Sequence, residues 1–159
     1  MVGTALKVNK SITVSASPER AFEVFASRTS DWWPREHHLG KTSDFATILE
    51  PRPGGRWFER QSDGAEFEIG KIIAWDPPKR IVITWELDEE FQHNPAVASE
   101  VEVTFTPVAV NSTRVDIEHR NFDSLGERAA RMRNMFDADN AWVHVLREFA
   151  KQVEAAEHQ

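Results

Sequence analysis

Two ionisable side chains in this 159-residue chain fall where apolar residues are expected. Glu59 lies in the first of three strand-like runs over residues 54–85, and His119 lies in an alternating run over residues 113–120. Successive side chains of a strand point to opposite faces, so alternation places both among inward-facing residues. A carboxylate beside an imidazole in a poorly hydrated site favours the charged pair and shifts both pKa values, as acid–base catalysis requires. Alternatively, both are satisfied structural groups, with His119 bonded, for instance, to a backbone carbonyl.

The face occupied by Glu59 depends on the register of a central hairpin. Ser62-Asp63-Gly64 separates two alternating runs, and its glycine occupies the third loop position, which is typical of a three-residue hairpin loop. This loop places Glu59 opposite Phe67, whereas a two-residue loop would oppose two glutamates, which is unfavourable. The same register pairs Trp57 with Ile69. It predicts one face composed of Trp57, Glu59, Phe67, Ile69, Ile73 and Trp75.

Three strands are predicted over residues 54–85, and the elements around them follow from periodicity. Alternation predicts further strands over residues 7–14, 42–50, 100–106 and 113–120, with one buried and one solvated face each. Residues 88–98 are predicted to form a polar loop.

Helix signals lie at both ends of the chain. Ser17-Pro18-Glu19-Arg20 has the N-cap serine, first-turn proline and acid that begin a helix. Ser124-Leu125-Gly126-Glu127 has the spacing of a capping box before a second helix, and Asp137 and Asp139 are candidate caps for a third. Apolar residues then recur at helical spacing to near the C-terminus: Trp142, Val143, Leu146, Phe149, Ala150 and Val153.

Composition narrows the class of protein. The length suits one domain over residues 1–159. There is no cysteine, which excludes disulfides, thiolate metal sites and cysteine nucleophiles. The formal charge of −7 is spread along the chain and disfavours nucleic acid as a partner. Neither a signal peptide nor an apolar run of membrane-spanning length is recognised, so a cytoplasmic location without a membrane span is expected. No cofactor is expected.

The pair His37-His38 invites a metal-site interpretation, with Asp31 and Glu36 nearby. Adjacent residues in an extended segment point in opposite directions, so the two imidazoles do not easily share one ion. A solvated loop is the preferred interpretation, and no metal site is predicted.

The order of strand, helix, six strands and a long terminal helix predicts an α+β protein. One face of its antiparallel sheet is solvated, and the other packs against the C-terminal helix. Where such a sheet curves strongly, helix and sheet separate at one end and leave a cavity.

Several short motifs, in this order and spacing, resemble a known family: Gly54-Gly55-Arg56-Trp57, Asp63-Gly64, Trp75-Asp76-Pro77-Pro78-Lys79-Arg80, Ser99-Glu100-Val101-Glu102-Val103 and Glu118-His119-Arg120. Together they resemble bacterial proteins related to the C-terminal domain of the Hsp90 ATPase activator, within the START/Bet v1-like (SRPBCC) superfamily. The resemblance covers essentially the whole chain. It implies a helix-grip fold, in which a curved antiparallel sheet wraps around a long C-terminal helix and encloses an apolar cavity.

The resemblance admits three functions, because this fold does not settle function. The first is binding of a small apolar or amphipathic molecule, for which Glu59 and His119 would orient a polar group. The second is a cyclase-like or hydrolase-like enzyme using the same two residues as acid and base. The third is a co-chaperone-like regulator of an Hsp90-type ATPase, and a homodimer is a plausible assembly. The residues expected to supply the cavity surface are Trp57, Phe67, Trp85, Phe105, Ile117 and Trp142.

Overall fold

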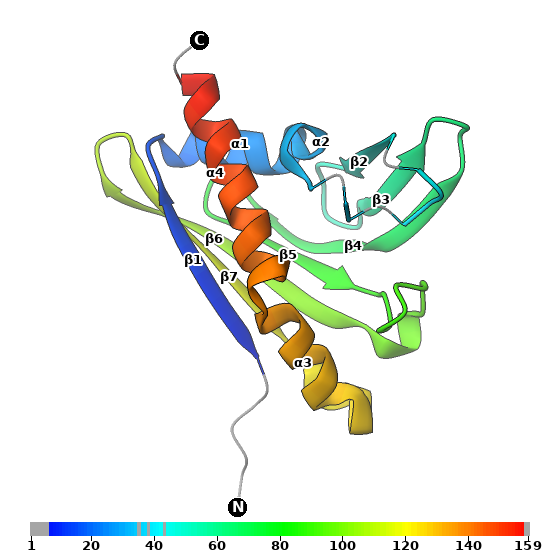
Figure 1. Ribbon diagram of the computed structural model, residues 1–159. Coiled ribbons are helices and arrows are strands. Elements are labelled where there is room, and N and C mark those ends of the chain that lie inside the picture. Colours follow the sequence, from blue (N-terminus) through cyan, green and yellow to red (C-terminus); the bar gives the residue numbers. More distant parts are fainter. Residues whose placement is uncertain (1–6, 35, 38, 43, 158–159) are drawn as a thin grey trace, which may run out of the picture.

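A computed structural model of the chain describes residues 7–34, 36–37, 39–42 and 44–157. One antiparallel sheet of seven strands runs in the order β1-β7-β6-β5-β4-β3-β2 (Figure 1). The strands are β1 (Val8–Val14), β2 (Phe45–Leu49), β3 (Arg56–Gln61), β4 (Glu66–Asp76), β5 (Arg80–Trp85), β6 (Ser99–Ala109) and β7 (Ser112–Arg120). The α-helices are α1 (Pro18–Ser27), α2 (Thr29–Trp32), α3 (Ala129–Asp137) and α4 (His144–Glu157). Short helical turns cover Pro95–Val97, Phe122–Arg128 and Asp139–Val143.

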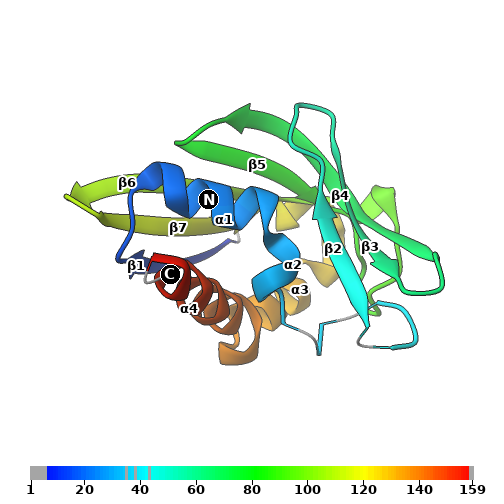
Figure 2. The same ribbon diagram turned by 90° about the horizontal axis from the view of Figure 1, so that it is seen from above.

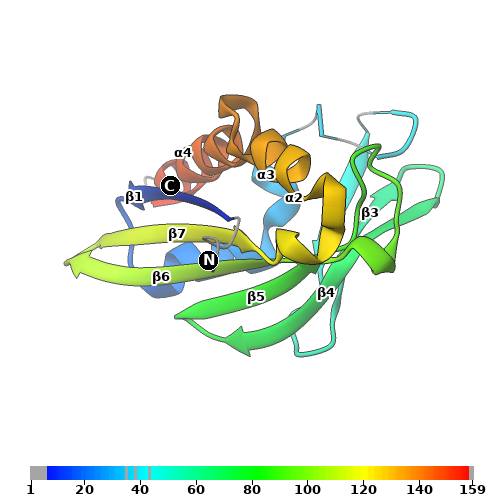
Figure 3. The ribbon, with the colours of Figure 1, turned by 90° about the horizontal axis from the view of Figure 1, so that it is seen from below.

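The sheet bends around the helices. Figure 2 shows β2 and β3 turned up toward α2, while α4 crosses the sheet beside β1. Figure 3 shows the segment between β5 and β6 rising on the same side of the sheet as α3. The α+β helix-grip architecture predicted from the sequence is therefore confirmed.

Alternation correctly assigned the inner face of the long strands. The predicted inward residues of β5, β6 and β7 are all buried: Ile81, Ile83, Trp85, Val101, Val103, Phe105, Val115, Ile117 and His119. Their opposite neighbours include an ionic row on the outer face, in which Arg120 contacts Glu100, Glu102 and Glu118. Burial of the apolar row supplies the main stabilisation of this half of the sheet.

The central hairpin has the predicted loop but not the whole predicted register. Gln61 and Ala65 close the three-residue loop, Gly64 has φ +92°, and Glu59 pairs with Phe67. A bulge between Trp57 and Phe58 then shifts the register, so Trp57 pairs with Gly70 rather than Ile69. The predicted inward position of Ile73 is also wrong, because its side chain is 51% exposed while Ile72 is buried. The bulge brings Ile72 to the helix side of β4, and a second register shift follows between Ile72 and Ala74. Beyond it, Trp75 is half-buried against Phe22 of α1, on the predicted side.

The helix starts follow the sequence signals only in part. Ser17 caps α1, and its Oγ accepts a hydrogen bond from Arg20 N at 3.2 Å, as predicted. The predicted start at the capping box is wrong, because a 3-10 segment interrupted by Gly126, with φ +62°, precedes α3 and the α-helix begins at Ala129. Ala138, rather than Asp137 or Asp139, occupies the N-cap position of the next segment.

Two backbone breaks shape the C-terminal helical region. The chain is extended at Ala138, between α3 and the next turn, and Ala141 has the non-helical angles φ −101° and ψ −119°. These breaks move the residues around Trp142 off a continuous helical face.

The second strand is shorter than the predicted range of residues 42–50, since β2 spans Phe45–Leu49.

Candidate functional site

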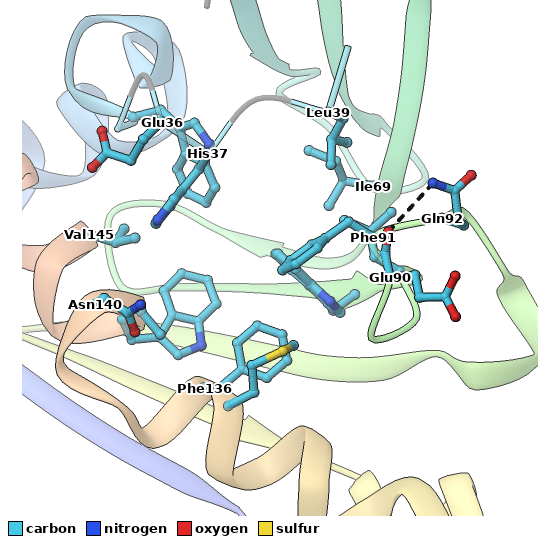
Figure 4. A pocket seen from close by; sticks show the side chains of 16 residues that line it. Glu36, His37, Leu39, Ile69, Glu90, Phe91, Gln92, Phe136, Asn140 and Val145 are labelled. Atoms are coloured by element: carbon cyan, nitrogen blue, oxygen red, sulfur yellow. Dashed lines mark hydrogen bonds between the residues drawn. The ribbon is translucent and has the colours of Figure 1, made fainter. Parts of the chain in front are cut away.

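A cavity of about 490 Å³ opens between the sheet and the break that separates α3 from α4. Figure 4 shows Glu36, His37, Asn140 and Val145 on one side of it, opposite Leu39, Ile69 and the 90–92 segment. Its volume lies within the range of small-molecule sites in proteins. The described side chains that line it are Trp33, Glu36, His37, Leu39, Ile69, Trp85, Leu87, Glu90, Phe91, Gln92, Met135, Phe136, Asn140, Ala141, Trp142 and Val145.

Two of the predicted cavity residues, Trp85 and Trp142, belong to this lining. Trp57 is buried behind Trp85, with ring centroids 5.6 Å apart. Phe105 packs in the core against Phe22 and Phe25 of α1. Two of the six predicted residues therefore belong to the cavity wall, Trp57 and Phe105 belong to the core behind it, and a ligand-binding role for the set stays a prediction.

The other predicted site residues lie in or beside the core. Ile117 is buried in β7, and Phe67 is half-buried in β4, opposite Glu59. Glu59 and His119 are both completely or almost completely buried, at 1% and 0% exposure.

His119 supports the cavity wall from behind. Its Nδ1 accepts a hydrogen bond from Trp142 Nε1 at 3.1 Å, so Nε2 carries the proton of the neutral ring and donates to Ser99 Oγ at 2.7 Å. The ring packs against Phe136 and Phe122, with centroids 4.4 and 4.5 Å away. Burial lowers the pKa of His119 to about 3, so the imidazole is neutral at neutral pH. This geometry fixes the orientation of the Trp142 indole.

Glu59 organises the backbone at the cavity rim. Its carboxylate accepts hydrogen bonds from Leu39 N at 2.6 Å, Gly40 N at 2.8 Å and Gln61 Nε2 at 2.7 Å. Charge-assisted bonds of this kind are stronger than neutral ones. Glu59 thereby anchors the loop that carries Leu39 into the cavity lining.

Glu59 and His119 are joined to different partners. Within the described part of the chain, no hydrogen bond links the carboxylate to the imidazole, whereas an acid–base pair requires one or a close approach. A catalytic role for Glu59 and His119 therefore stays a prediction. The hydrogen bonds found for each residue favour a structural role.

Two of the three tryptophans that line the cavity differ in the state of their indole N–H groups. Trp142 donates to His119, but Trp85 Nε1 is buried and has no acceptor among the residues that the structure describes. A buried donor without an acceptor is costly and calls for a partner such as a water or ligand oxygen. The Trp85 ring therefore lines the cavity while its Nε1 atom stays enclosed in the wall.

The loops supply lining residues that sequence periodicity did not identify. Phe91 belongs to the predicted polar loop, yet its ring lies at the cavity with 46% exposure, on a residue with φ +60°. Leu39 also enters the lining from irregular backbone, whereas Met135 enters it from α3, beside the buried Phe136. An exposed aromatic residue in a polar loop was the signal available for Phe91.

The prediction that His37 lies in a solvated loop is wrong, because its side chain lines the cavity. Its ring contacts those of Trp33 and His144, with centroid distances of 6.2 and 5.9 Å. Burial lowers the pKa of His37, although the neighbouring Glu36 carboxylate raises it in part. His38 and its predicted loop position lie outside the described residues.

The bent sheet, the crossing C-terminal helix and the cavity between them define a helix-grip protein of the START/Bet v1-like class. Residues 15–154 match the family described as Activator of Hsp90 ATPase homolog 1-like protein. The chain belongs to this family, which confirms the resemblance found in its sequence motifs. No curated protein matches the chain.

Solved structures extend the comparison. The chain is 39% identical to an anthrahydroquino-gamma-pyrone synthase, Txn09, complexed with SUM, over 91% of this chain and 95% of that one, with a TM-score of 0.64. It is 30% identical to CalC, a self-sacrificing resistance protein from Micromonospora echinospora, over 94% and 95% of the chains, with a TM-score of 0.68. The Aha1 dimer from Colwellia psychrerythraea is 18% identical over 93% and 96% of the chains and has a TM-score of 0.59, which shows a shared fold. Among the described residues, no helix has the length and apolar character needed to cross a bilayer.

Proposed function

We propose that this protein binds a planar, amphipathic aromatic molecule in the cavity between its sheet and its C-terminal helices. The observation that carries this proposal is a cavity of about 490 Å³ whose wall includes the rings of Trp33, Trp85, Phe91, Phe136 and Trp142. Aromatic rings bury a large apolar area and stack on other rings, so they suit a flat ligand.

The polar groups of the cavity indicate that the ligand is amphipathic. Glu36 and Glu90 place two carboxyl groups in the lining. His37, Gln92 and Asn140 add polar groups at the rim. A purely aliphatic ligand would leave these groups without partners.

The relatives support the same class of ligand. Txn09, named an anthrahydroquino-gamma-pyrone synthase, is similar to this chain over nearly its whole length. Fused-ring aromatic compounds are therefore the first ligands to test. We extend to this chain the aromatic class of ligand and not that protein's reaction.

A thermal-shift screen with hydroxylated and methoxylated anthraquinones tests the proposal. A ligand present at a hundred times its dissociation constant adds about 2.7 kcal/mol to the free energy of unfolding. For a protein of this size, that raises the melting temperature by roughly 5–10 °C. Quenching of tryptophan fluorescence then gives the affinity.

The variant Phe91→Ala separates binding from folding, because Phe91 lines the cavity but is 46% exposed. We expect the variant to melt within about 2 °C of the parent protein and to lose roughly tenfold in affinity, since a ring contact with the ligand is removed. Val110→Ala is the matched control, because Val110 is 92% exposed at the β6–β7 turn and outside the lining.

Equal affinities for the parent and Phe91→Ala proteins would contradict the assignment of the cavity as the binding site. A flat screen across the whole ligand set would argue against the binding function. It would favour the co-chaperone-like alternative, in which the protein acts through its surface.

A further inference from the structure

Phe91 has a backbone conformation that its residue type rarely adopts. Its φ is +60°, and a side chain with a Cβ atom is strained in this left-handed region. The other non-glycine residues with positive φ in the described chain are Asn111 and Asn121, and asparagine tolerates this region because its short side chain can hydrogen-bond locally. An aromatic residue at this position therefore calls for a reason other than the shape of the turn.

The turn around Phe91 is built on Asp88. One carboxylate oxygen of Asp88, Oδ1, accepts hydrogen bonds from the backbone N–H groups of Glu90 at 2.9 Å and Gln92 at 3.0 Å. The backbone of Asp88 adds two more, since its carbonyl accepts from Phe91 N at 2.9 Å and its N–H donates to the Gln92 carbonyl at 3.0 Å. These bonds fix the backbone on both sides of Phe91.

The base of the turn is closed as well. Leu87 and His93 form an isolated antiparallel bridge, and Asn94 N donates to the Glu86 carbonyl at 2.7 Å. His93 Nε2 is also bonded to Glu86 Oε1 at 2.9 Å. The turn is therefore held by the residues that directly follow β5.

Folding gains little from the ring that this turn presents. Phe91 is 46% exposed, whereas the wall residue Trp85 is 6% exposed. A strained residue persists where its surroundings impose it, and such residues concentrate at binding and active sites. Phe91 lines the cavity, and Figure 4 shows it across the cavity from Asn140 and Val145. The ring is thus placed where a bound ligand would contact it.

We propose that Asp88 is a positioning residue that holds Phe91 in its left-handed conformation, so that the Phe91 ring packs against a flat ligand at the mouth of the cavity. This inference rests on the proposed binding function and specifies the residues that prepare the mouth for the ligand. A turn that is already formed lowers the ordering cost of binding, because the ligand does not have to immobilise the ring. Asp88 itself lies outside the described lining and acts through Phe91.

A double-mutant cycle tests the proposal. 2-Hydroxyanthraquinone is titrated into the full-length parent, Asp88→Ala, Phe91→Ala and double-variant proteins at a temperature where all four are folded, and binding is followed by tryptophan quenching. We expect Phe91→Ala to lose about tenfold in affinity and Asp88→Ala about fivefold or more. Because Asp88 acts through the Phe91 ring, the double variant should also lose about tenfold, and not the roughly fiftyfold that independent effects would give.

Two further variants distinguish positioning from general damage to a turn. Asp88→Asn keeps an oxygen that can accept from the same backbone N–H groups, so it should bind the probe within about twofold of the parent. Asp63→Ala is the matched control, because Asp63 Oδ1 accepts from Ala65 N at 2.9 Å in the β3–β4 loop, outside the described lining. This variant loses the same kind of bond, yet its affinity should also stay within about twofold of the parent.

The strain at position 91 is tested separately by Phe91→Gly. Glycine has no Cβ and adopts positive φ freely, whereas alanine removes the ring but keeps the strain. We expect Phe91→Gly to melt about 2–4 °C above Phe91→Ala, while both variants bind the probe equally weakly. This pair separates the backbone strain at the position from the contribution of its ring to binding.

The outcomes distinguish the two proposals. If 2-hydroxyanthraquinone does not bind the parent protein, both the proposed class of ligand and the role of Asp88 are contradicted. If it binds the parent and Asp88→Ala equally, or if the losses multiply in the double variant, binding stands and the role of Asp88 is refuted. An equal loss of affinity in Asp63→Ala, or a Phe91→Gly protein that melts at or below Phe91→Ala, refutes that role as well.

Discussion

The buried His119 imidazole allows the loss of folding stability at acid pH to be calculated. In the folded protein its pKa is about 3, because burial disfavours the charged ring, whereas its ordinary value is 6.5. As the pH falls below about 6.5, His119 becomes protonated in the unfolded chain but stays neutral in the folded chain. The free energy of unfolding therefore falls with decreasing pH, and this loss continues until the folded pKa is reached.

The magnitude follows from the size of that gap. Each pH unit between the two pKa values removes about 1.4 kcal/mol from the free energy of unfolding. At about pH 5, which is 1.5 units below the ordinary value of 6.5, His119 alone has cost the protein about 2 kcal/mol. For a chain of this length, that corresponds to about 4–8 °C in melting temperature.

The variant His119→Gln isolates this contribution. A glutamine can accept from Trp142 and donate to Ser99, as the neutral imidazole does, but it takes up no proton. At neutral pH we expect it to be less stable than the parent by about 1–3 kcal/mol, because the ring contacts with Phe122 and Phe136 are lost.

The assay is urea unfolding of both proteins between neutral pH and about pH 5. The carboxylates common to the two proteins cancel in the difference, so the stability advantage of the parent should shrink by about 2 kcal/mol across this range. A constant difference would refute the reasoning, because the folded imidazole would then bind its proton as readily as the unfolded chain does.

Four further substitutions, each measured by urea unfolding, test contacts around the cavity and within the sheet. Trp142→Phe should cost about 1–3 kcal/mol, because the buried Nδ1 of His119 loses its donor. Trp85→Phe should cost about 1 kcal/mol less than Trp142→Phe, since both remove part of a buried indole but only the N–H of Trp142 has a partner in the described structure; equal losses at the two tryptophans would contradict this contrast. Glu59→Gln should cost about 2–3 kcal/mol through weaker hydrogen bonds to the rim backbone, and an unchanged stability would show that these bonds contribute nothing. Gly70→Ala should cost about 3 kcal/mol or more, because its Cβ would lie 1.7 Å from a β5 carbonyl oxygen, and a neutral result would exclude the close approach of β4 and β5 there.

The fold could be predicted from the sequence because strand alternation is a strong local signal. The burial of His119 in β7 and of Glu59 in β3 both follow from counting residues along a strand. The bulge beside Trp57 has no such signal. It depends on the close contact between Gly70 and the backbone of β5, which alternation along a single strand does not reveal.

The cavity was harder to predict than the sheet, because its rim is built from irregular backbone. Phe91 reaches the site from a left-handed residue in a turn, and His37 from a loop without periodicity. Ala141 breaks the helical repeat where Trp142 enters the lining. In each case long-range packing, and not local spacing, decides where the side chain lies.

The division of the cavity between a buried wall and an exposed rim has a consequence for how this protein can change. The wall residue Trp85 is also a core residue, so its replacement affects folding. Rim residues such as Phe91, Gln92 and Asn140 are exposed and carry little of the core, and substitutions at such positions usually alter stability by about 0.5 kcal/mol or less. Under the proposed binding function, the shape and polarity of the rim can therefore change, or be varied in a laboratory library, without loss of the sheet and its helix.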